Sequence, residues 1–128
     1  MKKNIVFLVF ILFSLFITGC KYDFIMPEEV PVIDNGGEPI SFATQVVPIF
    51  SASNKCTSCH QPGGLGNPDL LTASSVYANI VPAYVNTGAP ETSKIYINST
   101  SGNHNNTKLS ALQAQLLLTW ITEGAQNN

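Results

Sequence analysis

Apolar residues form one nearly continuous run close to the start of the chain and periodic stretches later in it. The run covers residues 5–17, contains Ser14 as its one polar residue, and follows Lys2 and Lys3. A helix of this length spans roughly 20 Å, which is short of the ~30 Å hydrocarbon core of a bilayer. A basic start followed by a short apolar run is typical of a signal peptide, which we expect to cover residues 1–19.

The first periodic stretch begins at Ser41, a residue that can cap a helix. Phe42, Val46 and Phe50 recur at helical spacing, so we expect them to form one apolar face. Pro48 lacks the N–H that a helix interior needs, and it therefore predicts a bend or a helix end before it. We expect the apolar face to contact the last helix of the domain.

Two short helices are expected in the middle of the chain. The first covers residues 72–80 and ends at Pro82. The second begins at Pro90 and runs through Ile97. Nine of the ten residues at 98–107 are Asn, Ser, Thr or Gly, which indicates a loop.

The final helix has the clearest pattern of all. Ser110 and Gln113 form a capping box at its start, and Gly124 provides a stop after its end. Its apolar stripe consists of Leu109, Leu112, Leu116, Leu117, Trp120 and Ile121. No strand pattern is convincing, so the sequence predicts an all-α domain.

Three parts of the chain differ in character. After the leader, residues 20–40 are rich in proline, glycine and acidic residues, which predicts a flexible tether. A short edge strand at residues 30–33 is the alternative interpretation. Residues 41–128 then form one small domain, too short for a TIM barrel or a complete dinucleotide-binding enzyme.

Composition excludes one class of partner. The chain has eight acidic residues against six lysines and no arginine, a formal net charge of −2. Without the first 19 residues, four lysines face eight carboxylates, about −4. Phosphate contacts need clustered Lys and Arg, so we expect no nucleic acid as a partner. No acid–base pair, nucleophile triad or phosphate-binding glycine loop stands out either, so enzymatic turnover is not expected.

The leader ends in Ile17-Thr18-Gly19-Cys20, which resembles a bacterial lipobox. In that motif the cysteine becomes lipidated and N-terminal, and several acyl chains on one residue give a stable membrane attachment. We therefore expect Cys20 to anchor the protein to a membrane of the bacterial cell envelope, outside the cytoplasm. The alternative is an uncleaved anchor with an incidental cysteine.

The strongest chemical signal lies at residues 56–60, which read C-T-S-C-H, the pattern of covalent c-type haem attachment. Two thiols one turn apart can each add to one vinyl group of the porphyrin, and the adjacent imidazole then reaches the iron. A zinc site would need four ligands, with only His104 left to complete a set. A Cys56–Cys59 disulfide is a further alternative. The single motif predicts one haem c, held by Cys56, Cys59 and His60.

A loop is expected directly after the motif. Residues 61–68 contain three glycines and two prolines, which do not fit regular structure. We expect this loop to wrap the proximal side of the haem. A backbone carbonyl near Pro62 or Pro68 is expected to accept the hydrogen of His60 Nδ1, which fixes the tautomer and aims the ring.

The order of these features resembles a known family. The chain from Phe42 through the C-x-x-C-H motif, followed by S-K-I-Y at 93–96 and W-I-T-E-G-A at 120–125, is similar to small bacterial class I cytochrome c domains. Such domains also occur in planctomycete membrane-associated proteins, and the resemblance covers about residues 41–125. It implies about three main helices plus short ones around one haem, with Phe42 and Trp120 at the crossing of the first and last helices. It also implies one-electron transfer, the iron cycling between ferric and ferrous states.

The chain departs from this family at the distal ligand. These domains usually supply a methionine shortly before the last helix, whereas Met1 and Met26 both precede the haem motif here. His104 occupies the place of that methionine, so the resemblance implies axial ligation by His60 and His104. Loss of the methionine is expected to lower the haem potential. The alternative is a solvated His104 and a distal site that holds water or nothing.

Together these features predict a membrane-anchored electron carrier that docks transiently on other redox proteins. Its negative charge favours a basic patch on the partner and an association that depends on ionic strength. The alternative function is a haem-based small-ligand sensor or binding module with an open or displaceable distal site.

Overall fold

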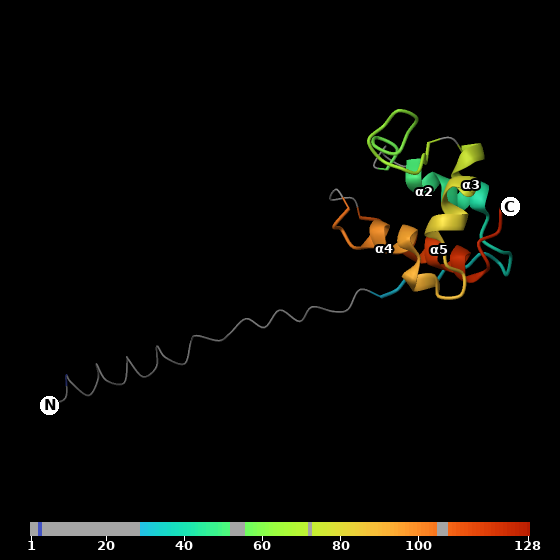
Figure 1. Ribbon diagram of the computed structural model, residues 1–128. Coiled ribbons are helices and arrows are strands. Elements are labelled where there is room, and N and C mark those ends of the chain that lie inside the picture. The colour runs from blue at the N-terminus through green and yellow to red at the C-terminus, as the bar shows by residue number, and fades with distance from the viewer. Residues whose placement is uncertain (1–2, 4–28, 52–55, 72, 105–107) are drawn as a thin grey trace.

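The computed structural model describes residues 29–51, 56–71, 73–104 and 108–128, together with Lys3. Its helical elements, in chain order, are η1 (Phe42–Val46), α2 (Val47–Ser51), α3 (Ala73–Tyr84), η3 (Pro90–Thr92), α4 (Lys94–Thr100) and α5 (Ala111–Thr122). Figure 1 shows these elements gathered into one body. The described residues contain helices and no strand, so the predicted all-α class is confirmed.

Several predictions fall on residues that the structure does not describe. The leader at residues 1–19, apart from Lys3, lies outside the described part, and so do Cys20 and Met26. Among the helices that are described, none is both long enough and apolar enough to cross a bilayer.

The first helical segment changes its winding just before Pro48, as the sequence predicts. The Ser41 hydroxyl accepts a hydrogen bond from the backbone N–H of Thr44 and so caps η1. The wide turns of η1 end when the N–H of Val47 donates to the carbonyl of Phe42. Pro48 is then the second residue of α2, a position at which a helix needs no backbone donor.

Helix α3 does not end at Pro82 but continues to Tyr84, so the predicted helix end is wrong. A proline near the end of a helix removes one backbone donor. Val81 and Tyr84 are half-buried and pack against the core, and this packing offsets the loss. The extra residues matter because they bring the Tyr84 side chain to the cavity described below.

The next predicted helix is divided in two. Ser93, between η3 and α4, is buried, and its hydroxyl accepts a hydrogen bond from the N–H of Asn86 at 2.9 Å. Helix α4 then extends to Thr100, three residues into the segment that the sequence predicts to be a loop. The hydroxyls of Ser99 and Thr100 donate to carbonyls one turn back, at Ile95 and Tyr96, which satisfies these polar side chains within the helix.

Helix α5 has the predicted ends. Ser110 and Gln113 form both hydrogen bonds of the capping box, and Gly124 adopts a positive φ of 98° at the C-terminal stop. Most of its predicted stripe is buried or half-buried, but the Leu112 side chain is 53% exposed. Leu112 is therefore not part of the buried stripe, contrary to the prediction.

The core is centred on the contact between η1 and α5. The Phe42 and Trp120 rings lie 5.1 Å apart, and the Tyr77 ring of α3 meets Phe42 edge-on at 5.2 Å. Trp120 donates its indole N–H to the carbonyl of Gln126 at 2.9 Å. The predicted meeting of Phe42 and Trp120 is confirmed.

Part of the segment expected to be a tether packs on the domain. Ile40 is buried, and its N–H donates to the Glu123 carboxylate at 2.7 Å. Ile33 also packs against the core, whereas Val30 and Val32 are exposed. The C-terminal residue Asn128 accepts hydrogen bonds from the start of η1, and Figure 1 shows this end of the chain beside that segment.

Candidate functional site

The C-x-x-C-H motif forms a single tight turn. The N–H groups of Cys59 and His60 both donate to the carbonyl of Cys56, at 3.2 and 2.9 Å. Within this turn Thr57 is buried, and both cysteines and His60 are half-buried. One turn of chain therefore brings two sulfur atoms and one imidazole to the same cavity.

The loop after His60 folds back on this turn. The N–H of Gly66 donates to the carbonyl of Cys59 at 3.0 Å, and the N–H of Leu70 donates to the carbonyl of His60 at 2.9 Å. The carbonyl of Pro68 lies 2.8 Å from His60 Nδ1. A carbonyl is only an acceptor, so Nδ1 carries a hydrogen and donates it in this contact. This is one of the two carbonyl positions that the sequence predicts.

Two glycines allow this close return. A Cβ at Gly64 would lie 2.2 Å from the carbonyl oxygen of Cys59. A Cβ at Gly66 would lie 2.9–3.0 Å from three atoms of the His60 ring. Both separations are shorter than side chains tolerate, so the loop backbone can reach the motif only where the side chain is a hydrogen.

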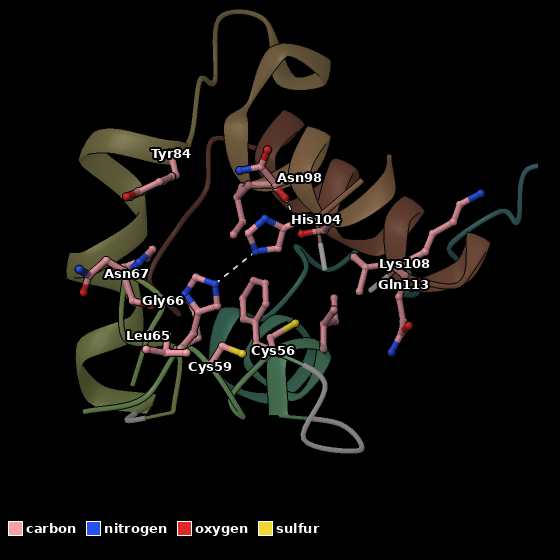
Figure 2. Close-up of a pocket in the computed structure, with 18 residues that line it drawn as sticks. Cys56, Cys59, Leu65, Gly66, Asn67, Tyr84, Asn98, His104, Lys108 and Gln113 are labelled. Carbon is pink, nitrogen blue, oxygen red and sulfur yellow. Dashed lines mark hydrogen bonds between the residues drawn. The ribbon is translucent and has the colours of Figure 1, made fainter. Parts of the chain in front are cut away.

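The motif opens on a cavity of about 450 Å³, within the usual size range of small-molecule sites. Figure 2 shows this cavity with the two imidazoles near its middle and the two cysteine sulfurs on one side of them. Its apolar lining comes from separate elements and consists of Ile49, Phe50, Leu65, Leu70, Ile95 and Leu109. A mainly apolar wall with a few converging polar groups is typical of a cofactor site.

The structure brings His60 and His104 together although they are 44 residues apart. Their Nε2 atoms lie 3.4 Å apart, and their ring planes are inclined by 37°. The His104 side chain is otherwise exposed, on the loop that follows α4.

These residues fit a haem. Metal–imidazole bonds are about 2.0–2.1 Å long, so two imidazoles on opposite sides of one metal ion place their nitrogens about 4 Å apart. The observed 3.4 Å between Nε2 of His60 and Nε2 of His104 is close to this span. The hydrogen bond from His60 Nδ1 to Pro68 is the usual support of a metal-ligating histidine.

A site with more protein ligands is not seen in the part of the chain that the structure describes. There, no group of three or more His, Cys, Asp or Glu side chains is placed to hold a metal ion. Haem iron needs fewer protein ligands, because the porphyrin itself occupies the equatorial positions. A structural zinc ion would need four protein ligands instead.

Sequence reasoning missed five residues that line the cavity with polar groups: Tyr84, Asn98, Ser99, Lys108 and Gln113. Tyr84 follows the buried residue Ile80 by four positions, so helical periodicity would have placed it on the inner face of α3. The interpretation of Pro82 as a helix end concealed that signal. Lys108 and Gln113 flank the start of α5, which was itself predicted correctly.

Comparison of the chain with protein-family models, with curated proteins and with solved structures finds no match. The site is therefore interpreted from its own residues and from the motif that they form.

Proposed function

We propose that this chain is a membrane-anchored c-type cytochrome of the class I type, which carries single electrons through one covalently attached haem. The observation that carries the proposal is the arrangement of the C-x-x-C-H motif. Cys56, Cys59 and His60 line one cavity, and Nε2 of His60 faces Nε2 of His104 across it at 3.4 Å.

Haem supplies the electron chemistry, since its iron alternates between ferric and ferrous states. The chain holds the group in three ways. Cys56 and Cys59 provide thioether links to one edge, and His60 provides the proximal nitrogen, aimed by the carbonyl of Pro68. His104 provides the distal nitrogen, and two histidines without a methionine favour a low potential.

The apolar walls of the cavity support the same role. Phe50 is fully buried, and Leu70 and Ile95 are nearly so. Such walls would exclude water from much of the ring, so that little solvent rearrangement accompanies a change of charge. A largely dry site favours electron transfer between docked proteins.

The anchor and the partner follow from the sequence. A lipidated Cys20 would hold the domain at a membrane of the bacterial cell envelope, on a side outside the cytoplasm. The excess of carboxylates over lysines favours a redox partner with a basic docking surface. A Cys20→Ser variant should leave the cleaved protein in the soluble fraction, and persistent membrane attachment of the cleaved chain would contradict the anchor.

The central test is covalent haem retention. The full chain is expressed with a cytochrome c maturation system, and a variant with Cys56→Ala and Cys59→Ala serves as the matched control. We expect haem to remain on the wild-type chain after denaturation and to be lost from the control. A colourless wild-type chain, produced by machinery that matures another cytochrome in the same cells, would refute the proposal.

A second function is favoured by one observation, the exposure of the His104 side chain on its loop. A distal ligand at the surface is easier to displace, as a haem-based sensor or small-ligand binder requires. Carbon monoxide distinguishes the two functions. Slow uptake by the ferrous, low-spin protein supports the electron carrier, whereas rapid uptake supports the ligand binder.

A further inference from the structure

The edge of the haem that faces away from the motif needs a binding site of its own, if the proposed function is correct. In protoporphyrin the two propionates occupy the half of the ring opposite the vinyl groups. Thioether links at Cys56 and Cys59 therefore direct the propionates to the opposite side of the cavity. These carboxylates carry negative charge and need hydrogen-bond donors wherever the protein covers them.

Tyr84 lies on that side of the cavity. It is the last residue of α3 and lines the cavity together with both cysteines and His60. In Figure 2 the Tyr84 side chain and the cysteine sulfurs lie on opposite sides of the two imidazoles. Tyr84 is half-buried, and its ring packs against the core, which fixes the direction of the hydroxyl group.

The Tyr84 hydroxyl has no hydrogen-bond partner among the residues that the structure describes. The other core tyrosine of α3, Tyr77, donates its hydroxyl to the carbonyl of Ala125 at 2.8 Å. Phenolic hydroxyl groups that are partly buried normally find such a partner. A hydroxyl donor that lines a cavity and has no protein partner is suited to donate to an acceptor on a bound ligand.

Among the residues that the structure describes, only one cationic side chain lines the cavity. Lys108 is the one lysine among the residues that line the cavity, and the chain contains no arginine. Its side chain is exposed, and Figure 2 shows it extending away from the two imidazoles. The amides of Asn67 and Asn98, which also line the cavity, are further neutral donors.

We propose that Tyr84 donates its hydroxyl hydrogen to a haem propionate, so that this carboxylate is held by a neutral donor and not by a cation. The helix end beyond Pro82 then has a binding role, because it carries the phenol to the cavity. A hydrogen bond from a hydroxyl to a carboxylate is short and strong, and it would fix the rotation of the propionate.

The test uses the mature holoprotein and two single-atom deletions. Tyr84→Phe removes the hydroxyl and keeps the ring. Tyr96→Phe removes a hydroxyl from another half-buried tyrosine that packs against the core but does not line the cavity. Resonance Raman spectra report the propionate-bending band, which responds to hydrogen bonds at the carboxylate. We expect a shifted band in Tyr84→Phe alone, with unchanged spin-state bands in all three proteins.

A second measurement needs no variant. Transfer of the wild-type holoprotein into D2O should shift the same band, because the phenolic hydrogen exchanges. A propionate band that stays the same in Tyr84→Phe and in D2O would overturn this site while leaving the cytochrome intact. A wild-type chain that acquires no covalent haem would instead overturn the proposed function, and this site with it.

Discussion

Replacement of Gly64 by alanine should destabilise the domain from a position far from its apolar core. Gly64 is exposed, yet its added Cβ would lie 2.2 Å from the carbonyl oxygen of Cys59 and 3.0 Å from that of Gln61. Both neighbours are backbone atoms, so neither can rotate away. The loop must retreat by about 0.8 Å merely to reach the 3.0 Å below which real Cβ contacts essentially never fall.

That retreat would strain the hydrogen bonds that join the loop to the motif. The nearest are the bond from Gly66 N–H to the Cys59 carbonyl, at 3.0 Å, and the bond between His60 Nδ1 and the Pro68 carbonyl, at 2.8 Å. Overpacking of this kind costs about 1–3 kcal/mol of the free energy of unfolding. For a domain of this size the melting temperature should fall by about 5–20 °C.

The measurement is thermal and guanidinium unfolding followed by circular dichroism at 222 nm, which does not depend on the identity of the cofactor. Gly88→Ala is the matched control, because its added Cβ would meet nothing closer than 3.5 Å and its φ is not positive. We expect the control to be neutral or slightly stabilised. Equal unfolding free energies for Gly64→Ala and Gly88→Ala would refute the claim that the loop backbone at Gly64 lies too close to the motif to accept a side chain.

Four further substitutions test other parts of the molecule. If the chain is the proposed cytochrome, His104→Ala should convert a low-spin haem into one with high-spin bands and rapid carbon monoxide uptake, and an unchanged visible spectrum would remove His104 as a ligand. Trp120→Ala should lower the free energy of unfolding by about 3–5 kcal/mol, measured by denaturant titration. Leu112→Ala, at a side chain 53% exposed, should lower the free energy of unfolding by less than about 1 kcal/mol. A loss as large as that of Trp120→Ala would contradict the assignment of Trp120, and not Leu112, to the core. Ser110→Ala should cost about 1 kcal/mol through the lost cap of α5, and no change would contradict the capping box.

The parts of the fold that follow from local interactions could be predicted from the sequence. The capping box of α5 depends on residues three positions apart, and the turn of the C-x-x-C-H motif depends on five consecutive residues. The direction of the Pro68 carbonyl could also be anticipated, because a loop of eight residues returns to the histidine that starts it. In each case the two partners are close along the chain, so few alternative arrangements compete.

The features that could not be predicted depend on tertiary packing. Pro82 is a strong local signal for a helix end, but the burial of Val81 and Tyr84 outweighs it. The contact of Glu123 with Ile40 joins residues 83 positions apart, and an acidic residue after the end of a helix gives no sign of such a partner. The approach of His104 to His60 could be inferred only through the family resemblance, since nothing local directs a histidine in a polar loop toward a distant motif.

The proximal side of the site is built mostly from backbone groups, which explains why its loop has such an irregular sequence. The contacts to the motif come from the N–H groups of Gly66 and Leu70 and the carbonyl of Pro68, while the Leu65 side chain just before them is fully exposed. A substitution such as Leu65→Ser removes none of these contacts, so it should leave the position of His60 unchanged. A Cβ at Gly64 or Gly66, one residue away on either side, enters the space that the motif occupies. Sensitivity in this loop therefore follows the approach of the backbone to the motif and not the burial or chemical character of the side chains.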